Sequence, residues 1–172
     1  KKYEKQDIRS LYDRLIIGEI VSQQFFEALE IKQPSLDFLV DMGLDGAFKE
    51  FSREIRKRFR LVALSNDCQA WADYRNERLG LGPFFDAYLT SSLLMAKKPY
   101  AEAYQNAVGY LGMPALSTSI HFMVDDTEGN LHVIHMMGWH PILFARDGTT
   151  SEKYPVVTSF NGLKRHLGEV VA

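Results

Sequence analysis

The sequence predicts an α/β fold in which helices cover both faces of a mostly parallel sheet, after an all-helical segment. Two observations support this prediction. Up to about Phe59, apolar residues recur at helical spacing and no convincing strand is present. Beyond that point, short apolar runs alternate with amphipathic helical stretches, which is the pattern of parallel strands joined by helical crossovers. The 172 residues suffice for one domain with a small attachment.

The first third is expected to hold several helices. The residues that recur at helical spacing are Leu11, Leu15, Ile16, Val21, Phe25, Phe26 and Leu29. Gly18 separates the two groups, and Pro34 with Ser35 interrupts the pattern. A charged helix is then expected from about Ala47 to Arg58.

The remainder predicts four short strands and four helices. The expected strands are Leu61–Leu64, Ala87–Thr90, Ile120–Val124 and Pro141–Phe144. The expected helices are Gln69–Leu79, Pro99–Leu111, a helix through Leu131 to Met137, and about Phe160–Leu167. Proline suits a helix's first turn because its missing N–H has no partner there, whereas Gly112 and Gly138 follow the ends of two helices.

Composition excludes several classes of protein. Hydrophobic residues make up 46% and charged residues 24%, which is ordinary for a globular chain. Because 20 basic residues balance 22 acidic ones, no overall field attracts nucleic acid or an anionic membrane. Cys68 is the single cysteine, which rules out an internal disulfide and suits a reducing compartment. With no long apolar stretch and no signal-peptide pattern, we expect a cytoplasmic protein.

Polar residues follow three of the predicted strands. The segment Ser65–Asp67 follows the first strand, Lys97–Pro99 lies after the second, and Asp125 and Asp126 end the third. Ligands of open parallel sheets bind beyond the carboxyl ends of the strands. We therefore expect a hydroxyl group, an ammonium group and two carboxylates to meet in one crevice.

Adjacent carboxylates at the end of a buried strand need compensation. Each one raises the pKa of the other, and both resist desolvation, so a cation, a proton or a set of donors must stabilise them. A divalent metal ion is the simplest compensation. The alternative is a structural role in which Asp126 or Thr127 caps the following helix. In the same way, Ser65 or Asp67 could be a helix cap and Lys98 a solvated loop residue.

Taken in order, these segments resemble the motifs of the haloacid dehalogenase (HAD) superfamily of hydrolases. The stretch LVALSN (61–66) resembles the second motif, SSLLMAKKPYAEAY (91–104) the third, and HFMVDDTEGNLHVIHMMGWHPILF (121–144) the fourth. The stretch GEIVSQQFFEALE (18–30) is similar to a helical cap. The resemblance implies a small all-helical cap with connecting helices over 1–58 and a Rossmann-like core over 59–172. Small sugar-phosphate phosphatases of the glucose-1-phosphatase type look most alike.

The resemblance also implies a reaction, the hydrolysis of a small phosphomonoester through an aspartyl-phosphate. Ser65 would bind an oxygen of the transferred phosphoryl group, and Lys98 would neutralise charge beside the nucleophile and the phosphate. Asn66 is placed with them on the substrate side, where it adds a hydrogen bond or shapes the turn. The expected partner is a small phosphorylated metabolite, without nucleic acid or membrane, and a homodimer is compatible with the sequence.

The implied cofactor is Mg²⁺. Asp126 would be its ligand, with Asp125 beside it and Asn130 in a supporting position one helical turn on. Hard oxygen ligands suit Mg²⁺, which takes one or two protein carboxylates and keeps several waters. The paired acids disfavour a dehalogenase proper, because those enzymes need no metal and resemble Ser-Ser-Asn at these positions.

The chain departs from the family at its first motif, a hydrophobic strand that ends in two aspartates spaced by one residue. No segment matches it, and the chain begins with Lys1 where a complete translation product would begin with methionine. We expect the natural gene product to carry that strand upstream, between the strands that end at Leu64 and Val124; the other reading is a rebuilt sheet. Without the nucleophile the chain should be inactive. The alternative function is a catalytically dead binding or interaction module.

Two other chemistries have less support in the sequence. His132 and His135 lie three residues apart, with Glu128 and His140 nearby, which is compatible with metal-ligand spacing. There are no cysteine ligands beside them, so zinc is disfavoured. Cys68 lies near a helix start, where a thiol pKa can be lowered, but no histidine is placed to activate it.

Overall fold

The computed structural model describes residues 5–41, 43–113 and 120–171. The chain divides into two compact units, each made of two segments. The first unit comprises Lys1–Leu44 and Arg60–Lys98, and the second comprises Asp45–Phe59 and Pro99–Ala172. The expected boundary between a cap and a core near residue 58 stays a prediction.

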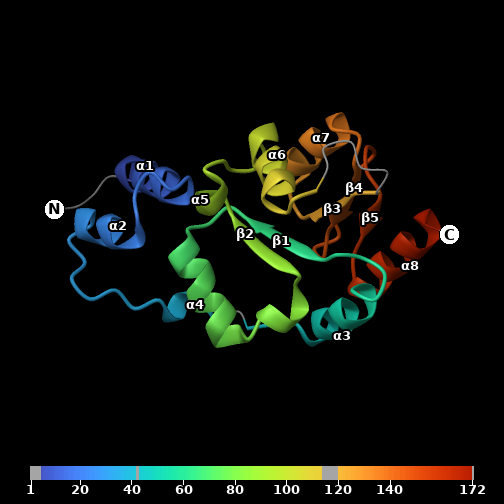
Figure 1. The fold of residues 1–172 in the computed structure, drawn as a ribbon, viewed down its shortest axis with the longest axis horizontal. Helices are drawn as coiled ribbons and strands as arrows, with labels where there is room; N and C mark the ends of the chain where they lie inside the picture. Colours follow the sequence, from blue (N-terminus) through green and yellow to red (C-terminus); the bar gives the residue numbers. More distant parts are fainter. Residues whose placement is uncertain (1–4, 42, 114–119, 172) are drawn as a thin grey trace. The chain divides into compact units, whose positions relative to one another are not determined.

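The first unit holds a two-stranded parallel sheet and most of the N-terminal helices (Figure 1). Its elements are α1 (Lys5–Ile16), α2 (Ser22–Ala28), the 3₁₀ turn η1 (Asp37–Leu39), β1 (Val62–Ser65), α4 (Gln69–Leu79), the 3₁₀ turn η2 (Gly82–Phe84), β2 (Ala87–Thr90) and α5 (Ser91–Leu94). Strands β1 and β2 pair in a register that sets Ser65 opposite Thr90. The last residues of the two strands therefore lie level at one end of the sheet.

An aromatic cluster around Trp71 attaches the N-terminal helices to α4. The indole ring lies 5.8 Å from the ring of Phe25 and 5.9 Å from those of Phe26 and Phe38, measured between centroids. Its Nε1 donates a hydrogen bond to Ser22 Oγ over 2.8 Å. Buried aromatic side chains contribute large apolar areas, and the indole N–H needs such a partner when it is buried. The segment before α2 also packs closely, because a Cβ at Gly18 would lie 2.7 Å from the carbonyl oxygen of Ser92.

The second unit holds a three-stranded parallel sheet with the order β3-β4-β5 (Figure 1). Its elements are α3 (Gly46–Ile55), α6 (Ala101–Tyr110), β3 (Phe122–Asp125), α7 (Glu128–Met136), β4 (His140–Phe144), β5 (Val156–Val157) and α8 (Phe160–Val170). One buried cluster comprises Leu131 of α7, Leu143 of β4, Ala145 and Tyr154. It packs α7 against the sheet and so orients the turn that joins β3 to α7.

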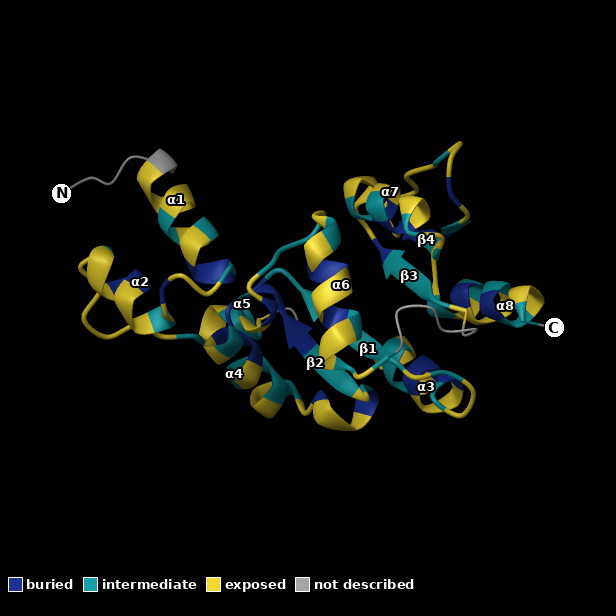
Figure 2. Ribbon diagram, turned by 45° about the horizontal axis from the view of Figure 1, so that its top comes forward, coloured by how far each residue is buried: buried dark blue, intermediate teal, exposed yellow. Residues whose placement is uncertain are grey.

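The predicted α/β class and the parallel strand pairing are confirmed, but the strands form two sheets instead of one. Among the described strands, β1 pairs only with β2, and β3 pairs only with β4. The four residues of β1 are all half-buried, whereas β2 becomes fully buried at its carboxyl end (Figure 2). Since β1 is apolar but only half-buried, the rest of its own unit leaves one edge and part of the faces of this strand uncovered.

Helix α5 and strand β5 were not predicted from the sequence. α5 has four residues and starts directly after β2, where Thr90 Oγ1 accepts a hydrogen bond from Leu93 N over 3.2 Å. β5 has only two residues, which is too short for an apolar run to stand out. Helix α6 begins at Ala101, two residues after Pro99. None of the helices in the described ranges is long and apolar enough to cross a membrane.

Candidate active site

Ser65 is the last residue of β1 and is half-buried. The chain then turns into α4, whose N-cap residue is Cys68, and this residue makes no side-chain capping bond. Neither Ser65 nor Asp67 therefore occupies the N-cap position of this helix. The hydroxyl of Ser65 stands at the carboxyl end of the strand, as the sequence predicted.

Asn66 is joined to Lys98 by two reciprocal hydrogen bonds. Asn66 Nδ2 donates to the carbonyl oxygen of Lys98 over 2.8 Å, and the N–H of Lys98 donates to Asn66 Oδ1 over 2.8 Å. The two residues are 32 positions apart in the sequence. The structure thus brings together two predicted site residues, through the side chain of one and the backbone of the other.

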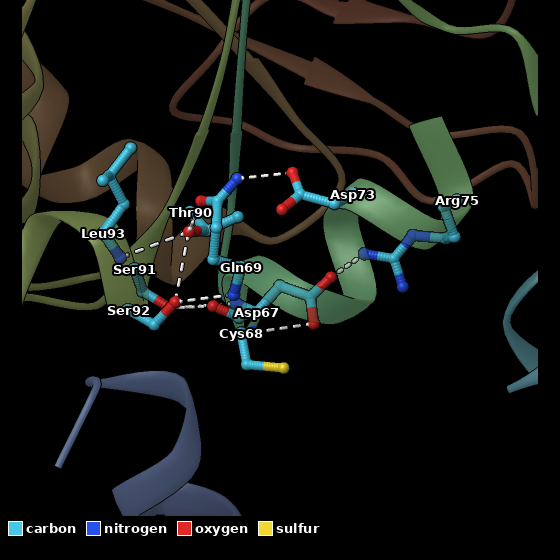
Figure 3. A network of polar contacts seen from close by, with 9 residues as sticks. All are labelled: Asp67, Cys68, Gln69, Asp73, Arg75, Thr90, Ser91, Ser92 and Leu93. Atoms are coloured by element: carbon cyan, nitrogen blue, oxygen red, sulfur yellow. Dashed lines mark hydrogen bonds and ion pairs between the residues drawn. The ribbon is translucent and has the colours of Figure 1, made fainter. Parts of the chain in front are cut away.

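Asp67, the next residue after Asn66, is the centre of a buried network (Figure 3). Its N–H donates to Ser91 Oγ over 2.9 Å, and its carbonyl oxygen accepts from Ser92 N over 3.2 Å. One carboxylate oxygen accepts from Cys68 N over 2.8 Å, and the other forms an ion pair with Arg75 of α4. The side chain of Asp67 is only 5% exposed, so this ion pair is sheltered from water. Asp67 is a structural residue of the β1–α4 turn.

The same network continues through Gln69 (Figure 3). Gln69 N donates to Ser92 Oγ over 2.8 Å, and Thr90 Oγ1 donates to Gln69 Oε1 over 2.8 Å. Gln69 Nε2 in turn donates to Asp73 over 2.7 Å. The first two bonds join the first turn of α4, which follows β1, to the carboxyl end of β2. The sequence patterns did not single out this network, although three consecutive hydroxyl residues at the end of a strand, Thr90 to Ser92, were a signal for it.

Asp125 is the last residue of β3 and is buried, with 8% of its surface exposed. Its Oδ1 accepts two hydrogen bonds of 2.9 Å, one from the N–H of Thr127 and one from Nδ2 of Asn130. Asp126 is exposed, and its carboxylate accepts from Thr127 Oγ1 over 3.3 Å. Thr127 is the N-cap residue of α7 but makes no side-chain capping bond. The N-cap position of α7 therefore belongs to Thr127 and to neither of the paired acids.

Tyr104 supports this turn from α6. It is completely buried, and its hydroxyl donates to the carbonyl oxygen of Asn130 over 3.1 Å. Burial, and to a lesser extent the charge of Asp125, raises the pKa of Tyr104 well above its ordinary value. The neutral phenol is thus a fixed donor beneath the residue that orients Asp125.

The oxygen donors of this turn fit Mg²⁺. Within residues 5–41, 43–113 and 120–171, no three His, Cys, Asp or Glu side chains form a group that could hold a metal ion. Two adjacent carboxylates on one turn nevertheless match the needs of Mg²⁺, which binds one or two protein carboxylates and completes its shell with water and substrate phosphate. His132 and His135, the candidates for a zinc site, are both exposed.

Cys68 lacks the environment of a reactive thiol. It is 4% exposed, and burial raises its pKa. The lowered pKa that a nucleophilic cysteine requires is therefore absent, despite the proximity of the α4 N-terminus.

The predicted site residues lie in two groups. Ser65, Asn66 and Lys98 belong to the first unit, whereas Asp125, Asp126 and Asn130 belong to the second. Within each group, hydrogen bonds connect residues that the sequence singled out: Asn66 with Lys98, and Asn130 with Asp125. The expected meeting of both groups in one crevice stays a prediction.

The sequence matches no protein-family model, and no curated protein is significantly similar to it. Solved structures do match, and among them is a HAD phosphatase from Thermococcus onnurineus, with 16% identity and a TM-score of 0.73. The match covers 95% of this chain and 77% of that one. The fold is that of the HAD-like hydrolases.

Other similar structures include different activities of the same fold. A 2-haloacid dehalogenase from Pseudomonas syringae is 18% identical with a TM-score of 0.68, and the match covers 98% of this chain and 82% of that one. A HAD-family enzyme from Bacteroides thetaiotaomicron, solved as a magnesium complex, is 16% identical with a TM-score of 0.67. That match covers 86% of this chain and 80% of the other. Identities this low establish the fold but not the reaction.

Proposed function

We propose that this chain forms the core of a Mg²⁺-dependent phosphatase of the HAD type, which hydrolyses a small phosphomonoester such as a sugar phosphate. The observation that carries the proposal is the Asp125-Asp126 pair at the carboxyl end of β3, with Asp125 held by Asn130. The pair has an exposed member and a buried, hydrogen-bonded member. A HAD phosphatase and a HAD-family magnesium complex among the similar structures support the same reading.

In this function the acidic turn would hold the metal ion. The exposed carboxylate of Asp126 is the available ligand, Asp125 lies beside it, and Asn130 keeps Asp125 oriented. Orientation of this kind by a neighbouring residue is a general requirement of metal sites. Bound Mg²⁺ would neutralise phosphate charge and orient the phosphoryl group.

Ser65 and Lys98 would serve the phosphate. The hydroxyl of Ser65 would donate to a non-bridging oxygen, and the ammonium of Lys98 would offset negative charge that the transferred group carries. Phosphoryl transfer needs little covalent chemistry from a protein, because positioning and fixed charge supply most of its catalysis. The substrate in this account is a phosphorylated metabolite, and nothing in the balanced charge of the chain favours nucleic acid or a membrane.

The nucleophile would be an aspartate carboxylate. It would attack phosphorus and release the alcohol, and water would then hydrolyse the aspartyl-phosphate to free phosphate. None of the five strands β1 to β5 is followed by two aspartates spaced by one residue. We propose that a further strand supplies them. The half-buried residues of β1 and most of β3 are compatible with such a neighbour.

The test is phosphate release from p-nitrophenyl phosphate by the complete gene product, with and without Mg²⁺. We expect turnover that requires Mg²⁺ and that falls by at least about 100-fold in Asp126→Ala. Turnover without Mg²⁺ that Asp126→Ala leaves unchanged would contradict the proposal.

Two alternatives give different results in the same assay. The dehalogenase similarity predicts metal-independent release of chloride from 2-chloropropionate, with no phosphate release. A catalytically dead binding module would give neither product but would still bind a ligand. The paired acids Asp125 and Asp126 favour the phosphatase over these two alternatives. Adjacent carboxylates need a compensating charge, and only the phosphatase reaction brings a metal ion to them.

A further inference from the structure

We infer that Asn66 is a positioning residue, which acts on the phosphate through Lys98 instead of touching the substrate. This inference rests on the proposed function, because that function gives Lys98 its role. Both ends of the Asn66 carboxamide bond to the backbone of Lys98, one as donor and one as acceptor, each over 2.8 Å. Two bonds to the backbone of Lys98 fix both the position and the orientation of its peptide group. A pair of hydrogen bonds between two antiparallel strands has the same effect.

The backbone of Lys98 has little freedom left under these bonds. It precedes Pro99, and the residue before a proline is restricted to extended conformations. The stretch between α5 and α6 forms no helix or strand of its own, and the neighbouring Lys97 is anchored by a 2.6 Å bond from its Nζ to Asp13 Oδ1. Because the lysine side chain starts from this fixed peptide, the Asn66 carboxamide decides which region the ammonium can reach.

Asn66 is itself anchored. It lies between the end of β1 and Asp67, whose backbone is bonded to Ser91 Oγ and Ser92 N (Figure 3). The carboxylate of Asp67 is fixed in turn by its ion pair with Arg75. A positioning group needs a rigid base of this kind, because a site residue must be held within fractions of an ångström.

Substrate binding that used Oδ1 of Asn66, or the N–H that already bonds to Lys98, would conflict with this arrangement, and only the second N–H of Nδ2 lies outside these two bonds. A substrate that displaced either carboxamide bond would release the peptide of Lys98, and the lysine would lose its position as the phosphate arrived. The geometry therefore favours an effect of Asn66 that exists only while Lys98 carries its ammonium group.

A double-mutant cycle in the complete gene product tests this dependence. The variants are Asn66→Ala, Lys98→Ala and the two combined, and the readouts are the affinity for inorganic phosphate and the KM and kcat for p-nitrophenyl phosphate. We expect Asn66→Ala to weaken phosphate binding about tenfold in the parent, and by less than about twofold when Lys98 is already alanine. Asn161→Ala, an exposed asparagine of α8, is the matched control that should change neither value.

A second measurement does not depend on turnover. Hydrogen exchange of the Lys98 N–H should accelerate in Asn66→Ala, because its acceptor is lost, and should stay slow in Asn161→Ala. An equal loss of phosphate affinity in both backgrounds would indicate direct substrate contact and overturn the inference, and so would unchanged exchange at Lys98. If Lys98→Ala alone leaves phosphate binding intact, the role of the lysine in the proposed function fails, and the role of Asn66 fails with it.

Discussion

The side-chain amide of Asn130 donates to Oδ1 of Asp125 over 2.9 Å, and this oxygen also accepts the N–H of Thr127. The buried acid is thereby held on the first turn of α7 while its neighbour Asp126 is exposed. In a magnesium site, an oriented carboxylate binds the ion without first losing rotamer freedom. The Asp125–Asn130 bond thus connects local structure to the proposed chemistry.

Asn130→Ala should therefore weaken Mg²⁺ binding by about 10- to 100-fold, because Asp125 loses one of the two donors that orient its Oδ1. Isothermal titration of the complete gene product with MgCl₂ measures the affinity. Asn161→Ala, which removes an exposed amide from α8, should leave it unchanged. Equal affinities for Asn130→Ala and the parent would mean that the bond has no part in metal binding.

The ion pair between Asp67 and Arg75 predicts a large loss of stability on truncation. The side chains are 5% and 20% exposed, and Asp67 Oδ2 has no hydrogen-bond partner among the described residues beyond this ion pair. Arg75→Ala leaves a buried carboxylate without its cation and should lower the free energy of unfolding by roughly 3 kcal/mol.

Urea unfolding measures this loss. Arg78→Ala on the same helix is the control: its side chain is 57% exposed and its Nη2 lies 4.0 Å from Asp37 Oδ1, so the change should stay within about 0.5 kcal/mol. A loss in Arg75→Ala as small as that expected for Arg78→Ala would show that the buried ion pair does not stabilise the fold.

Local patterns in the sequence predicted most of the fold. Helix α4 has the expected bounds, Gln69–Leu79, because Gly80 follows it in the left-handed region at φ +60°. Helix α5 was missed because its four residues continue directly from β2, and only the hydroxyl of Thr90 marks its start. Met95 then takes a positive φ of 54°, which no composition rule predicts for methionine.

The sequence singled out candidate site residues, whose roles stay predictions, but it did not reveal the hydrogen bonds between them. The positions after each strand identified Ser65, Lys98 and the acidic pair, because the ends of parallel strands are where ligands bind. The bond between Asn66 and Lys98 joins residues 32 positions apart, and no periodicity encodes such a contact. The division of the strands into two sheets was equally invisible in their apolar runs, which look alike in both.

Cys68 should react slowly with thiol reagents in the folded protein. It is buried, and burial raises its pKa, so little thiolate is present or accessible near neutral pH. We expect labelling by a disulfide reagent to be at least about 100-fold slower in the native protein than in urea, and Cys68→Ala to retain phosphatase activity. Rapid labelling of the folded protein together with loss of activity in Cys68→Ala would point to the cysteine chemistry instead.

Ionisation of Tyr104 should make the protein less stable as the pH rises past 10.0, the ordinary pKa of tyrosine. Burial raises the pKa of Tyr104 in the folded state, so the unfolded chain loses this proton first and is stabilised by doing so. The contribution of Tyr104 is fully present below that value and is lost as the pH rises toward the folded pKa. Between the two pKa values, the free energy of unfolding can fall by about 1.4 kcal/mol per pH unit.

Tyr104→Phe removes this titration together with the bond to Asn130. It should lower the free energy of unfolding by about 1 kcal/mol near neutral pH and flatten its decline in alkaline solution. Urea unfolding at about pH 8, 10 and 11 measures both effects. Tyr110→Phe, on the same helix with 61% of the tyrosine exposed, should keep the steep decline of the parent. If the free energy of unfolding falls with pH as steeply in Tyr104→Phe as in the parent, the phenol of Tyr104 is not the group whose ionisation destabilises the fold.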